Sequence, residues 1–271
     1  MHPTVNIAVR AARAAGDIIT RNMDRIDRLT VTKKRNNDFV SEVDNKAEAA
    51  IIDVLQQAYP DYGILAEESG TRNGIGGGSS EFQWIIDPLD GTTNFLHGFP
   101  QFAVSIALKH KDRLETGVIY DPVTQELFTA ARGEGAQLNG KKIRVSGHKG
   151  IAGALLGTGF PYHDQSYLDT YLETMKALMA PAAGIRRPGS AALDLAWLAA
   201  GRIDGFWEFN LNTWDIAAGI LIVREAGGIV TDFSGNDNYL TSGDIIAASP
   251  KVFPEMLKVI NACVKDSNYL K

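Results

Sequence analysis

Consecutive strand patterns in the first half of the chain constrain its fold more than any other feature. Four short segments rich in branched and aromatic residues follow one another with brief connections: FQWIID (82–87), FAVSIALK (102–109), TGVIYD (116–121) and ELFTAA (126–131). The dipeptide Asn139-Gly140 after them is typical of a β-hairpin turn. Because no helical pattern separates these strands, the first half predicts an antiparallel sheet.

Two amphipathic helices are predicted before this sheet. In the first, apolar residues recur at helical spacing from Val5 to Met23. The second begins at SEVD (41–44), which has the form of a capping box, and ends at Tyr59-Pro60. Together with the strands, these helices make the first half an α+β unit.

A short strand and a glycine-rich segment connect the second helix to the sheet. The strand pattern YGILAEE (62–68) ends in two acidic residues. The next segment, SGTRNGIGGGSS (69–80), is rich in glycine and serine and predicts a flexible lid or connector. Its glycines do not open a helix after a strand, so the segment lacks the pattern of a dinucleotide-binding turn.

The pattern changes after about residue 147, where strands begin to alternate with helices. Strands are predicted at 153–160 and in IDGFWEF, GIVTD and DIIAAS, and helices at 165–179, 190–202 and 214–228. Ser249-Pro250 is expected to start a last helix. Such alternation is typical of an α/β unit. We therefore expect two structural parts, 1–147 and 148–271, that form one compact unit.

Composition excludes several classes of protein. The 271-residue chain has 27 basic and 32 acidic residues and a net charge of −5, which gives no general footprint for nucleic acid or an anionic membrane. Its one cysteine, Cys263, lies in an apolar helical pattern and is interpreted as a buried structural thiol. Residues 1–20 lack a signal-peptide pattern, and no apolar run approaches the roughly 20 residues that span a bilayer. We expect a cytoplasmic protein.

The segment DPLDGTTN (87–94) has the residues of a metal and phosphate site. Asp87 ends a buried strand, a proline and a glycine favour a sharp turn, and Asp90 follows within it. Both carboxylates and the Leu89 carbonyl can then face one point, and such hard oxygen ligands suit Mg²⁺ or Mn²⁺ better than zinc. The next backbone amides can hold a phosphate if the chain enters a helical turn. The same residues are also common in a plain surface turn.

Other charged residues also have two interpretations. The acids at 67–68 end a strand as Asp87 does, so they meet Asp87 if the strands are neighbours and otherwise belong to a solvated loop. Converging carboxylates repel one another unless a cation lies between them. Asp215 and Asp44 fall in the first turns of helices, where acids are also favoured as caps. Lys33 fits an ordinary surface position as well as a site.

Two familiar kinds of hydrolase are disfavoured by what the chain lacks. Its five histidines show no paired spacing for a metal. No Ser-His-Asp order stands out, and GTGF (157–160) is not a nucleophile elbow. These absences argue against zinc hydrolases and serine hydrolases.

Several segments together resemble the inositol monophosphatase family. AEES (66–69), WIIDPLDGTTNFLHGFPQFAVSIAL (84–108) and WDIAAGILIVREAGGIVTDFSG (214–235) occur in the family's order, and SEVDNKAE and GSAALDLAWLAAGRIDGFWE fit as well. The resemblance covers nearly the whole chain, and the start MHPTVNIAVRAAR is especially similar to the bacterial inositol-1-monophosphatase branch. The family belongs to the lithium-sensitive, Mg²⁺-dependent phosphatases that include fructose-1,6-bisphosphatase. It implies a layered αβαβα sandwich of the α+β class.

The resemblance implies metal ligands from both parts of the chain. Glu67, Asp87 and the Leu89 carbonyl would hold a first Mg²⁺ ion, and Asp87, Asp90 and Asp215 would hold a second. Glu67 would also help to place a third, weaker ion, and Mn²⁺ is an alternative metal. The site would then lie between the two parts.

The resemblance also implies catalytic and phosphate-binding roles. Thr92, paired with Asp44, would orient and help to deprotonate the attacking water, with Glu67 near the same water. The amides of Gly91 and Thr92 would bind the phosphate, and Lys33 would lie within reach of it. The catalytic set is Glu67, Thr92, Asp44 and Asp90.

For the inositol ring, the resemblance implies contacts with Glu208 and Asp90 and with the turn at 189–191. Arg186 is expected to line the site in the bacterial branch. The family more often has threonine where Ser190 stands, and serine keeps the hydroxyl. The residues expected to contact substrate are Lys33, Leu89, Asp90, Gly91, Thr92, Arg186, Gly189, Ser190, Ala191, Glu208 and Asp215.

We therefore expect a phosphoric monoester hydrolase that uses a metal-activated water, with inositol 1-phosphate as substrate. Alternatives within this class are phosphatases for fructose-1,6-bisphosphate, histidinol phosphate, NADP or 3′-phosphoadenosine 5′-phosphate. A different alternative is a binding protein of the transcription complex with secondary phosphatase activity, because some bacterial relatives associate with that machinery. Its partners would be RNA polymerase or elongation factors. The family also implies a homodimer and inhibition by lithium.

Overall fold

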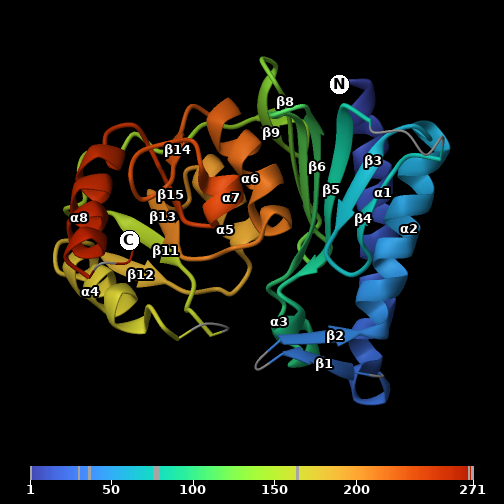
Figure 1. The fold of residues 1–271 in the computed structure, drawn as a ribbon, viewed down its shortest axis with the longest axis horizontal. Helices are drawn as coiled ribbons and strands as arrows, with labels where there is room; N and C mark the ends of the chain where they lie inside the picture. Colours follow the sequence, from blue (N-terminus) through green and yellow to red (C-terminus); the bar gives the residue numbers. More distant parts are fainter. Residues whose placement is uncertain are drawn as a thin grey trace.

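An eight-stranded sheet carries most of the first half of the chain in the computed structural model, which describes residues 2–29, 31–35, 38–75, 80–162, 165–267 and 269. The spatial order of its strands is β10-β9-β8-β7-β6-β5-β3-β4 (Figure 1). Neighbouring strands pair antiparallel except β3 and β5, which are parallel. The strands are β3 Gly63–Ala66, β4 Gly70–Arg72, β5 Phe82–Asp90, β6 Ala103–His110, β7 Arg113–Asp121, β8 Glu126–Ala131, β9 Gly135–Leu138 and β10 Lys141–Lys142.

Two long helices cover one face of this sheet. α1 (Pro3–Asn22) packs on β6 and β7, and α2 (Glu42–Ala58) packs on α1 and β5. Apolar side chains from both helices and from the sheet form one core, in which Ile51 and Trp84 are almost fully buried. Smaller elements complete this part: η1 Met23–Arg28, β1 Val31–Arg35, β2 Asp38–Ser41 and α3 Thr92–Leu96.

A five-stranded sheet is built from the second half, in the order β12-β11-β13-β15-β14. β11 pairs parallel with β12 and β13, and the other neighbours pair antiparallel. The strands are β11 Leu155–Thr158, β12 Gly184–Arg186, β13 Gly205–Glu208, β14 Ile229–Thr231 and β15 Ile245–Ala248. The helices of this half are α4 Leu168–Met179, α5 Ala191–Ala199, α6 Thr213–Glu225, α7 Tyr239–Ser242 and α8 Phe253–Asp266.

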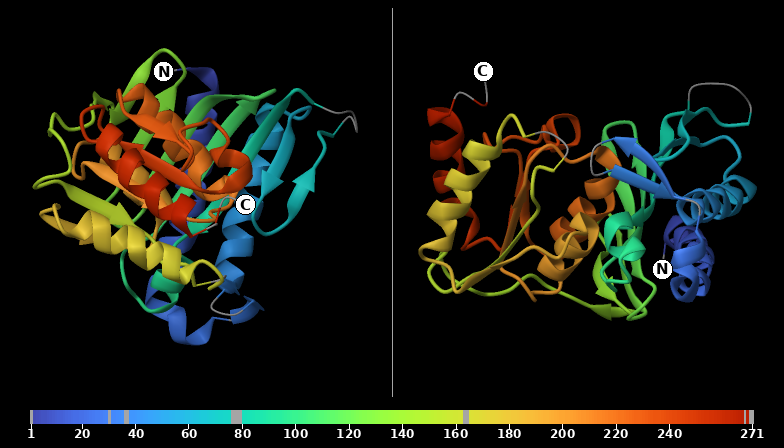
Figure 2. Two further views of the ribbon diagram at one scale, coloured as in Figure 1. Left: turned by 60° about the vertical axis from the view of Figure 1, so that its left-hand side comes forward. Right: turned by 90° about the horizontal axis from the view of Figure 1, so that it is seen from below.

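Two of these helices, α5 and α6, lie between the sheets. Every residue of α6 from Ile216 to Val223 is buried, because one side of the helix faces the first sheet and the other side faces the second. A helix covered all round must be apolar all round. Helices α4 and α8 cover the outer face of the second sheet, which completes a helix–sheet–helix–sheet–helix sandwich (Figure 2).

The layered α+β fold predicted from the sequence is confirmed, with local corrections. Part of the glycine-rich segment 69–80 is not a lid, because β4 (70–72) pairs with β3, while 76–79 lie outside the described residues. The last helix begins at Phe253 and not at Pro250. Asn139 and Gly140 both have positive φ, as the hairpin predicted. In the described ranges, no helix has the length and apolar character needed to cross a bilayer.

Candidate active site

Parallel pairing of β3 and β5 brings two acidic strand ends together. Ala66 is in register with Ile86, and the amide of Glu67 donates a hydrogen bond to the Ile86 carbonyl at 3.1 Å. Because parallel strands end at the same edge of a sheet, Glu67 and Asp87 leave their strands side by side. The sequence did not show whether these two strands are neighbours, and the structure shows that they are.

The turn after β5 bends its oxygen ligands toward the cavity. The Leu89 amide donates to Asp87 Oδ1 at 3.0 Å, and the pairing of β5 with β6 is irregular between Asp87 and Asp90. Gly91 has a φ of 98°, and a Cβ atom there would lie 2.8 Å from a neighbouring backbone carbonyl oxygen. Only glycine fits this position without strain. The chain then enters a helical turn at Thr92, as the predicted phosphate-binding arrangement of backbone amides requires.

Asp44 links the first turn of α2 to Thr92. Its Oδ2 accepts hydrogen bonds from the Ser41 amide and hydroxyl at 2.9 and 2.6 Å, which forms the predicted capping box. Its Oδ1 accepts from the Thr92 hydroxyl at 2.8 Å. The Thr92 hydroxyl oxygen also lies 3.0 Å from the Leu89 carbonyl oxygen. Asp44 therefore belongs to the capping box of α2 and is also the partner of Thr92.

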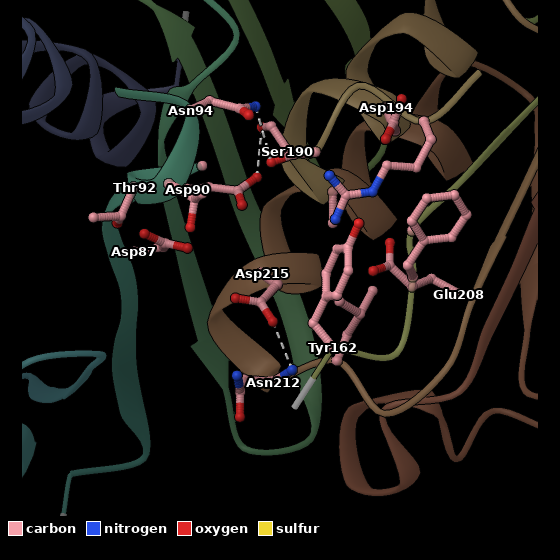
Figure 3. Close-up of a pocket in the computed structure, with 18 of the residues that line it drawn as sticks. Asp87, Asp90, Thr92, Asn94, Tyr162, Ser190, Asp194, Glu208, Asn212 and Asp215 are labelled. Atoms are coloured by element: carbon pink, nitrogen blue, oxygen red, sulfur yellow. Dashed lines mark hydrogen bonds between the residues drawn. The ribbon is translucent and has the colours of Figure 1, made fainter. Parts of the chain in front are cut away.

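Asp90 and Asp215 are oriented by elements of the second half. Asp90 Oδ2 accepts hydrogen bonds from the Ser190 hydroxyl at 2.6 Å and the Ala192 amide at 2.7 Å, at the start of α5. Asp215 lies in the first turn of α6, where its Oδ2 accepts from the Asn212 amide at 2.7 Å. Figure 3 shows both carboxylates on the wall of the same pocket. The first sheet and the central helices therefore meet at the site.

Burial raises the pKa values of these carboxylates, and neighbouring negative charges add to the effect for Asp87 and Asp215. Burial raises the pKa of Asp87 well above its usual range, and the negative charges of Glu67, Asp90 and Asp215 raise it further. Burial, with Asp90 and Glu67 nearby, also raises the pKa of Asp215 well above its usual range. Burial raises the pKa of Asp90 to about 6, although two hydrogen bonds to its carboxylate lower it. At neutral pH such a cluster needs protons or cations to neutralise it.

The chemistry of the donors fits a hard divalent cation. Asp87, Asp90 and Asp215 each accept a backbone hydrogen bond on one carboxylate oxygen, and Asp90 also accepts the Ser190 hydroxyl on that oxygen, so the protein fixes the orientation of all three carboxylates. These carboxylates and the Leu89 carbonyl are the oxygen ligands that Mg²⁺ and Mn²⁺ take. Within the described residues, no three acidic, histidine or cysteine side chains are close enough to ligate one ion as they stand.

A cavity of about 990 Å³ extends from these carboxylates to the end of β13. It brings together most of the residues that the sequence assigned to the site. Lys33 lies in β1, and its side chain falls outside the described part of the structure. Asp44 lies behind Thr92 and does not line the cavity. The expected residues that line it are Glu67, Asp87, Leu89, Asp90, Gly91, Thr92, Gly189, Ser190, Ala191, Glu208 and Asp215.

Two carboxyl groups form a second acidic region on the far wall of the cavity (Figure 3). Burial raises the pKa of Glu208 to about 8, against the opposing effect of Arg187. Burial and the charge of Glu208 also raise the pKa of Asp194, which is 1% exposed in the first turn of α5. Asp194 Oδ1 accepts no hydrogen bond from the described residues. Protonated carboxyl groups can donate as well as accept hydrogen bonds, which suits hydroxyl-bearing ligands.

Arg187 lines the cavity, whereas its neighbour Arg186 does not. The guanidinium carbon of Arg187 lies 4.8 Å from the ring centroid of Tyr162 and 5.1 Å from that of Phe160. Arg186 ends β12, is exposed, and donates to the Ile185 carbonyl. Successive side chains of an extended chain point to opposite faces, so only one of two adjacent arginines can face the cavity. Neither Arg187 nor Asp194 was predicted from the sequence as a site residue.

Comparisons with known proteins agree with this architecture. The model of the inositol monophosphatase family matches residues 1–265. The protein named Nus factor SuhB from Pseudomonas aeruginosa is 54% identical over 262 residues, which cover 96% of each chain. The crystal structure of the extragenic suppressor protein suhB from Bartonella henselae has a TM-score of 0.92 at 45% identity, and covers 96% of this chain and 98% of its own. An inositol monophosphatase from Anabaena has a TM-score of 0.80 at 35% identity, over 95% of this chain and 94% of that one.

The sandwich fold and the carboxylate-lined cavity, taken with these matches, define an enzyme of the phosphoric monoester hydrolase class. Enzymes of this kind depend in general on metal ions, in agreement with the oxygen donors described above. The chain belongs to the inositol monophosphatase family. The resemblance found in the sequence is thereby confirmed.

Proposed function

We propose that the protein hydrolyses the phosphate monoester of a small polyol with Mg²⁺ as cofactor, and that inositol 1-phosphate is its substrate. The observation that carries this proposal is the meeting of Glu67, Asp87, Asp90 and Asp215 at one end of a cavity whose far wall holds Glu208. An anionic phosphate approaches such a cluster only when cations neutralise it. Carboxyl groups on the far wall suit the hydroxyl groups of a polyol.

In this proposal the carboxylates hold two cations, with Mn²⁺ as an alternative to Mg²⁺. Glu67, Asp87 and the Leu89 carbonyl would bind the first, Asp87, Asp90 and Asp215 would bind the second, and a third, weaker ion would lie near Glu67. When bound, such ions supply a water of lowered pKa and neutralise charge on the phosphate and the leaving oxygen. The hydrogen bonds to the aspartates hold these carboxylates in place for this purpose.

The protein's own part in the chemical step lies with Thr92 and Asp44. Because the Thr92 hydroxyl donates to Asp44, its oxygen can accept a hydrogen bond from the attacking water. Burial raises the pKa of Asp44 above its ordinary value, although hydrogen bonds from Ser41 and Thr92 oppose this. A carboxylate of raised pKa is a better base, so Asp44 can take a proton relayed through Thr92. The amides of Gly91 and Thr92 would bind the phosphate at the start of α3.

A substrate panel with a Mg²⁺ titration tests the proposed function. The panel contains inositol 1-phosphate, fructose-1,6-bisphosphate, histidinol phosphate, NADP and 3′-phosphoadenosine 5′-phosphate. We expect Mg²⁺-dependent hydrolysis with the highest kcat/KM for inositol 1-phosphate, and inhibition by lithium. A much higher kcat/KM for another member of the panel would contradict the inositol assignment and leave the phosphatase class intact.

Replacing Gly159 with alanine is expected to weaken polyol binding specifically. A Cβ atom at this position would overlap the Glu208 carboxylate, which must then leave its place on the cavity wall. Loss of a hydrogen bond to a neutral carboxyl group costs about 0.5–1.5 kcal/mol, so KM for inositol 1-phosphate should rise by about 2- to 12-fold. Steady-state kinetics with inositol 1-phosphate and with p-nitrophenyl phosphate, which has no polyol, measure the difference.

Gly147→Ala is the matched control for this variant, because a Cβ atom there meets no neighbour within 4 Å. Its kinetic constants should equal those of the wild type for both substrates. Equal losses on inositol 1-phosphate and p-nitrophenyl phosphate in Gly159→Ala would show that Glu208 acts on something other than the polyol.

A second function in transcription is favoured by the relatives' names. The Pseudomonas aeruginosa and Escherichia coli relatives are both called Nus factor SuhB, at 54% and 52% identity. We propose that this protein also binds RNA polymerase or its elongation factors. Asp90→Asn separates the two functions in cells that lack the chromosomal copy. If this variant has no phosphatase activity but restores growth, binding is the essential function; if growth fails while the protein accumulates, catalysis is.

The proposal also includes a homodimer located in the cytoplasm. Family resemblance supports the dimer, and the low cysteine content supports a reducing compartment. Sedimentation equilibrium measures the first expectation, and fractionation of cells measures the second. A monomer at micromolar concentration would contradict the proposed assembly.

A further inference from the structure

Glu48 of α2 is a buried acid to which the proposed mechanism assigns no role. It lies one helical turn after Asp44 on the same buried face of the helix, and 3% of its surface is exposed. Glu48 does not line the cavity. A buried carboxylate is costly unless hydrogen-bond donors satisfy it, so its donors indicate its role.

Both carboxylate oxygens of Glu48 accept hydrogen bonds from consecutive backbone amides. Oε2 accepts from the Glu68 amide at 2.8 Å, and Oε1 accepts from the Ser69 amide at 3.0 Å. These two amides directly follow Glu67, whose own amide donates to the Ile86 carbonyl of β5. The turn that carries Glu67 is therefore held by the sheet on one side and by α2 on the other.

We propose that Glu48 is a positioning residue for the cation site and acts through Glu67. A carboxylate bound to two adjacent amides sets both the place and the tilt of that peptide segment, because charge-assisted hydrogen bonds are short and directional. Asp44, one turn earlier, accepts a hydrogen bond from the Thr92 hydroxyl, so one face of α2 orients two groups that the proposed mechanism places beside the attacking water. The inference rests on the proposed function and deepens it, since Glu48 touches neither substrate nor cation.

Glu48→Gln changes the contact with the least change in shape. Glutamine keeps one acceptor oxygen, but its NH2 group, which only donates hydrogen bonds, would face one of the two backbone N–H groups. One of the two hydrogen bonds is then lost, and two donors oppose each other. Glu48→Asp is the second variant, because it keeps the charge but shortens the side chain by one methylene group. Both variants should displace the turn and move the Glu67 carboxylate.

Isothermal titration calorimetry with Mn²⁺ in the absence of substrate gives a readout independent of turnover. Partners of metal ligands typically contribute about 10- to 100-fold to metal affinity, so the Kd for Mn²⁺ should rise about tenfold in Glu48→Gln. The Mg²⁺ concentration for half-maximal activity should rise in parallel, with KM for inositol 1-phosphate at saturating Mg²⁺ unchanged within about twofold. Hydrogen exchange at the Glu68 and Ser69 amides should be faster than in the wild type, even in chelator.

Asp53→Asn on the same helix is the control, because Asp53 is exposed and accepts one hydrogen bond, from Gln57. It should leave Mn²⁺ affinity unchanged. A folded Glu48→Gln protein with wild-type Mn²⁺ affinity would overturn the proposal, as would a raised KM without any change in metal affinity. If Glu48→Gln does not fold, the same measurements on Glu48→Asp decide. A wild-type protein that binds Mn²⁺ but hydrolyses no phosphate monoester would refute the proposed function without affecting this test.

Discussion

Replacing Asp87 with asparagine is expected to lower kcat/KM by at least about 10³-fold, a loss of about 4 kcal/mol of transition-state stabilisation. Asp87 is the one carboxylate that would contact both cations, so its charge contributes to the affinity for each. The same change should raise the melting temperature of the metal-free protein. Asparagine has the shape of aspartate and can still accept the hydrogen bond from the Leu89 amide. It removes one negative charge from a buried cluster of carboxylates that repel one another.

Steady-state kinetics and thermal unfolding in chelator measure the two effects. Asp232→Asn is a matched control, because Asp232 is also buried and accepts the Ser234 and Asn236 amides but does not line the cavity. This control should keep kcat/KM within about twofold of the wild type, as expected for a residue outside the site. An Asp87→Asn protein that keeps a tenth of the activity, or that melts below the wild type in chelator, would contradict our account of Asp87.

Removal of divalent cations is expected to abolish activity and to destabilise the protein more at pH 8 than at pH 5. Asp87, Asp90 and Asp215 have pKa values in the folded state above the ordinary range. The folded protein therefore binds more protons than the unfolded chain, and its stability falls as pH rises through the unfolded pKa near 4 and on to the raised folded values. Below the unfolded pKa this penalty disappears. Cations replace the protons, so stabilisation by Mg²⁺ should grow with pH.

Melting temperatures with chelator and with Mg²⁺, taken from pH 5 to pH 8, measure this effect. A cation at 100 times its Kd stabilises by about 2.7 kcal/mol, which corresponds to a shift of about 5–10 °C for each site in a chain of this size. Subtracting the melting temperature in chelator from that in Mg²⁺ removes the contribution of titrating groups whose pKa does not depend on the metal. Asp87→Asn should flatten the pH dependence of that difference. A difference that stays constant across this pH range would show that the cluster does not titrate as described.

Long, periodic elements could be predicted from the sequence, and so could short apolar strands such as β15 (Ile245–Ala248), whereas short strands without an apolar pattern could not. FAVSIALK became β6 (Ala103–His110), and the apolar segment at 214–228 became α6 (Thr213–Glu225). Strands such as β12 (Gly184–Arg186) are too short to show an alternating pattern of apolar residues. Such a segment becomes a strand because it pairs with a neighbouring strand, here β11. Residues 70–72, within the glycine-rich segment, likewise form a strand because they pair with β3. Tertiary contacts decide these elements, and local composition does not.

The carboxylate cluster of the site could be predicted from the sequence, and the far wall of the cavity could be predicted less well. Asp87 and Asp90 lie within one segment, and the family resemblance favoured a site role for Glu67 and Asp215, which the residues alone had left open. The sequence offered a reason to consider Asp194 as a site residue, because it is the one acid in the apolar segment SAALDLAWLAAGR. It offered none for Glu48, because the partners of Glu48 are backbone amides 20 and 21 residues away, and any residue type supplies those.

The placement of α5 and α6 between the sheets has a consequence for folding during synthesis. One core joins apolar residues of the first sheet, such as Ile85 and Ile119, to Leu195 and Ile220 of these helices. The ribosome releases the first sheet before the helices that cover its inner face, so a large apolar surface stays uncovered in the interval. We expect residues 1–147 made alone to be insoluble or held by chaperones, and co-synthesis of 148–271 to restore a soluble complex. Soluble, monomeric 1–147 would show that this face does not need its cover.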